Sequence, residues 1–142
     1  MLQLPNYEKC PCHSGRKYGQ CCQPFHEERR KPSPRQLMRA RYAAYALEGV
    51  PYIMKTTHPD SPHFNPNLPQ WERELFSFCH DVSFESLEVG KSLHKRNSEV
   101  AFVTFKAGLR DQKGIEVVMT EKSEFRFYDE EWFYYAGLEA DL

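Results

Sequence analysis

Four of the five cysteines in this chain lie within thirteen residues near its amino terminus, in the stretch KCPCHSGRKYGQCC. Their pattern is Cys10-x-Cys12, eight intervening residues, and then the adjacent pair Cys21 and Cys22. Two short pairs of thiols joined by a tight loop can surround one tetrahedral ion with little loss of chain entropy. The cluster therefore predicts a metal site in which these four cysteines hold one zinc ion.

A disulfide staple or a redox pair would also place thiols close together. Residues 1–10 offer no basic stretch followed by an apolar run, so we expect no secretory signal. No later segment approaches the roughly 20 uninterrupted apolar residues of a membrane helix, so we expect no membrane contact. We therefore expect a cytoplasmic protein, whose thiols are kept reduced and favour metal over disulfides. The spacing also differs from the C-x-x-C of a thioredoxin-like redox motif.

The residues around the cysteines fit a metal loop. Gly15 and Gly19 permit the positive φ angles that a chain wrapped around an ion requires. His26, four residues after Cys22, is an alternative ligand, whereas Cys79 lies in an apolar helical stretch and is expected to be inert packing. Three basic side chains can offset the negative charge of the thiolates: Lys9, Arg16 and Lys17.

The charge of the chain does not indicate a nucleic-acid-binding surface. The 142 residues carry a formal net charge of −1, and residues 1–34 hold only six Lys/Arg against three Asp/Glu. Aromatic residues in the expected strands could stack on bases only if basic side chains lay among them. The charged residues that accompany them there include Glu99, Glu116 and Glu124. We therefore find no strong signal for nucleic-acid binding.

The sequence resembles a known family in two places. CPCHSGRKYGQCC fits C-x-C-x(8)-C-[CH] and resembles the SEC-C zinc motif of the SecA translocation ATPase and of many small bacterial proteins, with His13 in place of the usual glycine. LMRARYAAYALEGVPYIMKTTHP, followed by Trp71, TEKSEF and EWFYYAG, resembles the YchJ-like family. That resemblance implies a SEC-C motif over residues 1–30 and, over 31–142, a domain similar to the nuclear transport factor two (NTF2) superfamily.

Periodicity and breakers give an independent expectation of the fold. Ser33 can cap a helix that Pro34 begins and Gly49 ends. The expected helices are Pro34 to Glu48, Pro51 to Thr57 and Leu68 to His80. The expected strands, rich in β-branched and aromatic residues, are Val82 to Val89, Glu99 to Lys106, Ile115 to Tyr128 and Glu131 to Gly137. Helices followed by an antiparallel meander predict an α+β fold, which agrees with the NTF2-like cone, in which helices pack on a curved antiparallel sheet that leaves a pocket at its open end.

Two charged residues fall where the pattern is apolar. Arg41 lies within the apolar stripe of the first expected helix, and Glu121 lies on the apolar side of the third expected strand. Two opposite charges converging inside the cone can offset one another, so we expect Arg41 and Glu121 to pair at or near the pocket. The residues expected at this pocket are Arg41, Tyr45, His58, Trp71, Glu121 and Tyr134.

The sequence contains no nucleophile elbow, P-loop, dinucleotide fingerprint or helical pair of zinc-binding histidines, so the chain is not expected to be an enzyme and its catalytic residues, if any, are unknown. A four-thiolate zinc leaves no open position for water, which indicates a structural metal. The first hypothesis is a non-catalytic adaptor whose SEC-C knuckle contacts a protein partner or the ribosome, as the resemblance to SecA implies. Alternatives are a small-molecule binder or enzyme that uses the cone pocket, with an unknown ligand, and a metal-dependent folding module.

Overall fold

Helices precede a single sheet along the chain. The structure, a computed structural model, describes residues 1–138. A 3-10 turn, Tyr18–Gln20, is followed by four helices: α1 (Gln23–His26), α2 (Pro34–Ala46), α3 (Val50–Lys55) and α4 (Leu68–Asp81). Four strands follow: β1 (Ser83–His94), β2 (Val100–Arg110), β3 (Glu116–Tyr128) and β4 (Glu131–Leu138). The α+β class is confirmed, and the expected second domain includes residues 139–142, which lie outside the described residues.

Helix α2 begins where the sequence predicts and ends slightly earlier. The Ser33 hydroxyl accepts a hydrogen bond from the Gln36 N–H, and the Gln36 side chain accepts one from the Ser33 N–H, so a complete capping box starts the helix. At the other end, Glu48 rather than Gly49 takes a positive φ, of 56°. Gly49 instead precedes α3 and allows a close approach to Ala44, where a Cβ would lie 3.3 Å from the Ala44 Cβ.

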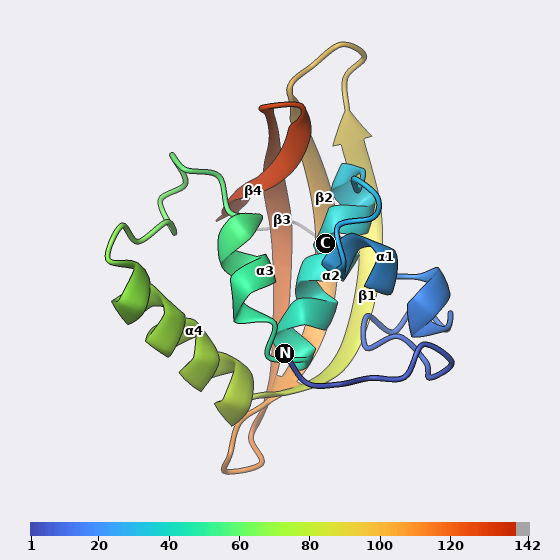
Figure 1. Cartoon of the computed structure of the whole chain (residues 1–142), viewed down its shortest axis with the longest axis vertical. Helices are drawn as coiled ribbons and strands as arrows, with labels where there is room; N and C mark the ends of the chain where they lie inside the picture. Colours follow the sequence, from blue (N-terminus) through green and yellow to red (C-terminus); the bar gives the residue numbers. More distant parts are fainter. Residues whose placement is uncertain (139–142) are drawn as a thin grey trace.

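The sheet is an antiparallel meander in the order β1-β2-β3-β4. β1 continues to His94, five residues beyond its expected end, because an irregularity between Val89 and Ser92 lets it stay paired with β2. The turn from β3 to β4 is two residues long, and both Asp129 and Glu130 have positive φ. The strands curve around the helical layer as Figure 1 shows.

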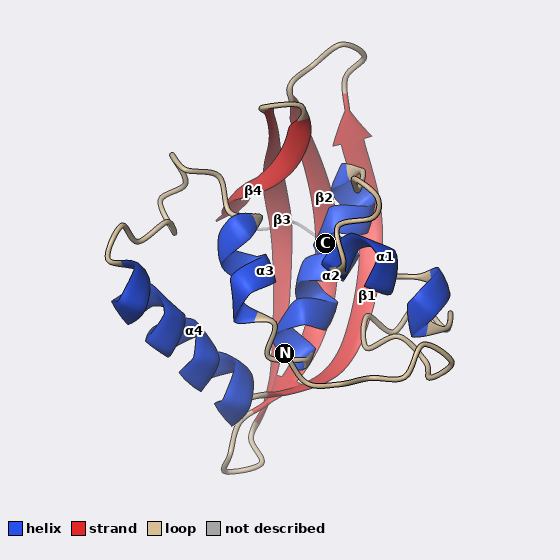
Figure 2. Ribbon diagram, viewed as in Figure 1, coloured by secondary structure: helices blue, strands red, loops and turns tan. Residues whose placement is uncertain are grey.

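Helix α2 lies against the sheet, with α3 beside it, while α4 stands apart on the other side of α3 (Figure 2). The core between these layers includes Leu37 of α2, Ile53 of α3, Val103 of β2 and Phe125 of β3, each at most 1% exposed. Trp71 and Cys79 are the buried residues of α4, while Phe76 and Phe78 are about half exposed. Helix α4 therefore covers the sheet incompletely and leaves space between the two.

The amino-terminal segment packs on α2. The Leu2 N–H donates to the Leu47 carbonyl at 2.7 Å, so the start of the chain lies at the carboxyl end of α2. The buried cysteines and Phe25 belong to the same apolar cluster as Leu37. The cysteine motif and the α+β layer therefore share one core, with α2 as the element between them.

Candidate metal centre and the cavity of the cone

The four cysteines come from two short turns held together by backbone pairing. Lys9 and Lys17 form an isolated antiparallel bridge, and the Cys10 N–H donates to the Arg16 carbonyl at 2.8 Å. These contacts close the loop and bring the first pair of cysteines to the second. Cys21 follows the 3-10 turn directly, and the next residue caps α1.

Two residues of this loop have left-handed backbone conformations. Gly15 has a φ of 84°, as expected, and His13 has a φ of 61°, the conformation that the glycine of the usual motif would take more easily. The expectation for Gly19 was wrong, because its φ is not positive. This glycine is needed for close packing instead, since a Cβ there would lie 2.8 Å from the Cβ of Asn6.

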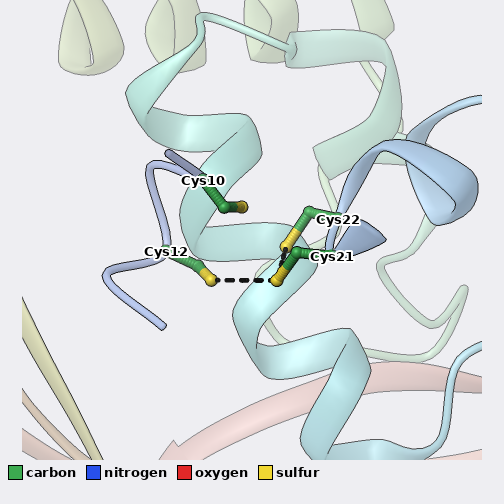
Figure 3. A group of neighbouring side chains, drawn as sticks. All are labelled: Cys10, Cys12, Cys21 and Cys22. Carbon is green, nitrogen blue, oxygen red and sulfur yellow. Dashed lines mark hydrogen bonds between the residues drawn. The ribbon is translucent and has the colours of Figure 1, made fainter. Parts of the chain in front are cut away.

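The four Sγ atoms of Cys10, Cys12, Cys21 and Cys22 lie within 4.8 Å of one another (Figure 3). The Sγ atoms of Cys12 and Cys21 are 3.5 Å apart and those of Cys21 and Cys22 are 3.9 Å apart. Four sulfurs at about 2.3 Å from one tetrahedral ion would be about 3.8 Å apart. The cluster thus has the size of a four-thiolate metal site, and these residues could hold a metal ion.

Burial raises the free-energy cost of ionising the four thiols. Cys10, Cys12 and Cys22 are buried, and Cys21 is half-buried. The hydrogen bond with Cys10 and then those with the other two thiols raise the pKa of Cys22, while the hydrogen bond from Cys10 lowers the pKa of Cys12. The thiols therefore share protons among themselves, and a bound cation is what would let all four ionise together.

One side chain outside the motif supports the cluster. Arg39, on α2, donates through Nη1 to the Cys12 carbonyl at 3.0 Å and lies 3.8 Å from the Cys12 Sγ. Within the motif, the Ser14 hydroxyl lies 3.3 Å from the Cys21 Sγ. A cationic donor beside a sulfur stabilises the thiolate form, as outer partners of metal ligands commonly do. The sequence pattern offered no sign of Arg39, because its partner is 27 residues away.

His26 is not placed as a metal ligand. Its Nε2 lies 2.7 Å from the Ala40 carbonyl and its Nδ1 lies 2.6 Å from the Tyr18 hydroxyl, so both ring nitrogens are already engaged. A carbonyl only accepts, so Nε2 carries the proton and Nδ1 accepts from Tyr18. Burial lowers the pKa of His26, in keeping with this neutral ring. His26 therefore joins the cysteine motif to α2.

A cavity of about 440 Å³ lies between α2, α4 and the sheet. Five of the six residues expected at the pocket line it: Arg41, Tyr45, Trp71, Glu121 and Tyr134. Further polar lining residues, which no pattern in the sequence indicates, are Thr57, His63, Asn65, Glu74 and Ser123. Several of them lie on the loop before α4 or on that helix, where no periodic signal points toward the sheet. Exposed lining residues such as His63, Glu74 and Met119 mark the mouth.

The sixth residue, His58, does not line this cavity, so that expectation was wrong. Its N–H donates to the Tyr134 carbonyl at 2.8 Å, which extends residues 57–58 alongside β4. Successive residues of an extended chain point to opposite sides, so Thr57 faces the cavity and His58 faces away. The His58 ring instead packs among Tyr128, Phe133 and Tyr135, and burial lowers its pKa.

The expected pairing of Arg41 with Glu121 is also wrong, although both line the cavity. Among residues 1–138, no salt bridge joins Arg41 to a carboxylate. Its Nη1 donates to the Ile53 carbonyl at 3.0 Å and to the hydroxyls of Thr56 and Thr57 at 2.7 and 3.2 Å. Acceptors at the end of α3 and just after it therefore hold the guanidinium, in place of a carboxylate from the sheet.

Glu121 has its own partner. The Ser123 hydroxyl donates to its Oε2 at 2.5 Å. Gly137 of the neighbouring strand leaves room for the carboxylate, since a Cβ there would overlap the Glu121 side chain. Glu121 is therefore placed by β3 and β4, and Arg41 by α2 and α3.

Comparison with known proteins places this chain among α+β proteins in which a SEC-C motif precedes an NTF2-like domain. Residues 8–24 match the SEC-C motif, and residues 33–137 match the family described as YchJ, middle NTF2-like domain. The chain therefore belongs to the YchJ family. Among the residues described, no helix is both long enough and apolar enough to cross a membrane.

Curated relatives and solved structures agree with this assignment. A UPF0225 protein of Deinococcus radiodurans is 38% identical to this chain, over 92% of this chain and 88% of its own length. A UPF0225 protein of Vibrio vulnificus is 36% identical, over 90% of this chain and 73% of its own length. The solution structure of a SEC-C motif containing protein from Rhodopseudomonas palustris has a TM-score of 0.79 and 34% identity, over 93% of this chain and 98% of that one. The crystal structure of a SEC-C motif containing protein from Psychrobacter arcticus has a TM-score of 0.76 at 23% identity, over 96% and 85%, and shows the same fold.

Proposed function

We propose that Cys10, Cys12, Cys21 and Cys22 hold one structural zinc ion in a reducing compartment, the cytoplasm. The separations of the four sulfurs support this proposal, and so does the burial of three of them. Four thiolates complete the tetrahedral shell, so the ion would fix the two turns against each other and leave no position for a substrate. The ion's part is therefore to shape the knuckle, which we define as residues 8–24.

The zinc-held knuckle is proposed to serve as a non-catalytic adaptor that contacts a protein partner or the ribosome. The observation that carries this proposal is the asymmetry of the knuckle. Its inner side packs on α2 through the cysteines and Tyr18, whereas its outer side exposes polar and basic groups. The exposed side chains are those of Lys9, Arg16 and Lys17, and the neighbouring Tyr7 is 67% exposed. Tyrosine and arginine are among the residue types enriched in protein interfaces, so Tyr7 and Arg16 favour this surface for recognition.

Co-sedimentation of the zinc-loaded protein with ribosomes, and capture of proteins on the immobilised chain, test the adaptor proposal. The double variant Arg16→Glu/Lys17→Glu reverses two exposed charges of the knuckle and is expected to weaken the contact. The matched control is Lys95→Glu/Arg96→Glu, which reverses two exposed charges in the turn between β1 and β2. If both double variants bind as the unchanged protein does, the knuckle does not carry recognition. It is then only a folding module.

The cavity supports a second candidate function, the binding of a small molecule. Its volume of about 440 Å³ falls in the usual range for ligand sites, and aromatic side chains with a few polar groups line it. A thermal-shift screen of metabolites tests this candidate, because a ligand that binds only the folded state raises the melting temperature. Stabilisation that a cavity-filling variant such as Ala107→Phe abolishes would support it.

A further inference from the structure

The cavity contains a buried cation that lacks an anionic partner. Arg41 is 7% exposed, and its guanidinium carbon lies 4.5 Å from the centroid of the Tyr134 ring. Its three hydrogen bonds to α3 and to the residues that follow all use Nη1 and neutral acceptors. A cation removed from water is costly unless an anion or several hydrogen bonds compensate it. The protein itself supplies only part of this compensation.

The three hydrogen bonds of Arg41 do not use its Nε or Nη2 groups. Within residues 1–138, no sealed side-chain nitrogen or oxygen lacks a hydrogen-bond partner, so Nε and Nη2 are not sealed in the core. Arg41 is a lining residue, and α2, α3 and the Tyr134 ring occupy its other sides. The open edge of the guanidinium therefore offers parallel donors to whatever occupies the cavity. A carboxylate matches that edge with two parallel hydrogen bonds.

An acceptor of opposite charge lines the same cavity. Glu121 accepts a hydrogen bond from Ser123 at Oε2, the Tyr134 hydroxyl is a further neighbour, and the carboxylate makes no ion pair among the described residues. Its charge would repel a dianion such as a phosphate more strongly than a monoanion. The free capacity of Glu121 suits a hydroxyl or amine donor of the occupant. Between the two charges, the walls are aromatic, with Tyr45, Trp71, Phe105 and Tyr134 among them.

We propose that the cavity binds a small organic monocarboxylate with a flat, unsaturated body and a hydrogen-bond donor, its carboxylate on Arg41 and its donor on Glu121. This inference rests on the second candidate function and names the chemistry of its ligand. The aromatic walls supply apolar contact area, and the two charges fix the orientation of the ligand. Neither charge is then left without an opposite or polar partner.

The test uses the zinc-loaded full chain and four groups of probes: 3- and 4-hydroxybenzoate, benzoate, benzyl alcohol and phenyl phosphate. Binding is read from the methyl NMR signals of the four methionines. Met38 and Met119 line the cavity, and Met1 and Met54 do not, so the second pair is an internal reference. We expect a hydroxybenzoate to shift the signals of Met38 and Met119 selectively. It should bind about tenfold more tightly than benzyl alcohol and more tightly than benzoate or phenyl phosphate.

Two variants separate the roles of the charges. Arg41→Lys keeps the charge and a donor for α3 but loses the planar edge, and it should weaken hydroxybenzoate binding about tenfold while leaving benzyl alcohol unaffected. Glu121→Gln keeps an acceptor for Ser123 but removes the negative charge. It should reduce the preference for hydroxybenzoate over benzoate and improve phenyl phosphate binding. The amide spectrum of each variant reports whether it has folded, and neither substitution changes the cavity volume greatly.

The outcomes distinguish the two levels of the proposal. Selective shifts with the expected order of affinities and the expected effects of both variants support the ligand chemistry. If benzyl alcohol or phenyl phosphate binds as tightly as the hydroxybenzoates, the cavity is a ligand site but the inferred chemistry is wrong. If no probe shifts Met38 or Met119, the inferred ligand chemistry is wrong, and the second candidate function fails as well if the thermal-shift screen of metabolites also finds no ligand.

Discussion

The Arg41 guanidinium lies over the face of the Tyr134 ring, with its central carbon 4.5 Å from the ring centroid. This contact joins α2 to β4 across the cavity. The backbone strengthens it, because the Tyr134 N–H donates to the Thr56 carbonyl at 2.8 Å, beside the hydroxyl that Arg41 contacts. The end of α3, the last strand and the buried cation thus form one connected unit.

That contact predicts a measurable coupling. In a double-mutant cycle, Arg41→Met and Tyr134→Leu should show a coupling energy of about 0.5–2 kcal/mol, the range of a partly desolvated cation–π pair. Tyr134→Phe keeps the ring and most of the contact, so its cycle with Arg41→Met should show little coupling energy. Denaturant unfolding of the four proteins in each cycle provides the measurement. Additive effects in the Tyr134→Leu cycle would contradict an energetic role for the contact.

The metal site predicts a defined stoichiometry. Purified protein should contain one zinc per chain by elemental analysis, and Cys12→Ser or Cys21→Ser should lose it. Cys79→Ser is the matched control, because Cys79 is buried away from the cluster and burial raises its pKa to about 12. Because the ligands must be thiolates, zinc affinity should fall as the pH falls. Retention of stoichiometric zinc by both ligand variants would contradict the assignment.

His58 predicts a pH dependence that is separate from the metal. The Asp60 N–H donates to its Nδ1 at 3.0 Å, and burial lowers its pKa below the usual 6.5. Between the lowered pKa and 6.5, the unfolded chain binds a proton that the folded chain does not. The stability that this difference provides is therefore complete above about pH 6.5 and declines as the pH falls below it.

The variant His58→Asn keeps an acceptor for the Asp60 N–H but cannot titrate. Its free energy of unfolding, measured on zinc-loaded protein between pH 7.5 and 5, should fall less steeply than that of the unchanged chain. The metal contributes equally to both curves, so the difference isolates His58. Parallel curves would show that His58 is not buried as a neutral ring.

The turn between β3 and β4 predicts a stabilising substitution. Glu130 is exposed and has a φ of 66°, a conformation that costs an L-residue more than it costs glycine. Glu130→Gly should therefore stabilise the protein by about 0.5–1 kcal/mol, after the greater entropy of glycine in the unfolded chain is counted. The control Lys113→Gly, in an exposed turn without positive φ, should be neutral or destabilising. Thermal unfolding measures both.

Much of the fold was predictable because local signals agreed with the tertiary structure. The cap at Ser33, the proline and glycine breakers, and the runs of β-branched and aromatic residues located most elements within a few residues. The extension of β1 was not predictable, because it depends on an irregular pairing with β2 that no local signal marks. Periodicity also misled at the start of β3, where Val117 lies on the expected apolar side but is 52% exposed.

The candidate site shows the same division. The spacing of the cysteines located their cluster, since its members are close in sequence. Arg41, Tyr45 and Glu121 were found because helix and strand periods indicate which face a residue occupies. Those periods do not indicate how far a side chain reaches, and so they could not show that Thr56 and Thr57 would take the Arg41 hydrogen bonds. Nor could they reveal Arg39 beside Cys12, a contact that only the docking of α2 creates.

One turn of α2 contacts both proposed binding sites, the metal centre and the cavity. Arg39 donates to Cys12 on one side of the helix, and Arg41 lines the cavity on the other. By thermodynamic reciprocity, any change that metal loss causes in ligand affinity must be matched by an equal effect of the ligand on metal affinity. We expect chelation to weaken hydroxybenzoate binding at least about fivefold, measured by calorimetry. Through this helix, ligand binding in the cavity would then depend on whether the thiols hold a metal ion. Oxidants and the supply of metal would regulate the cavity without binding in it.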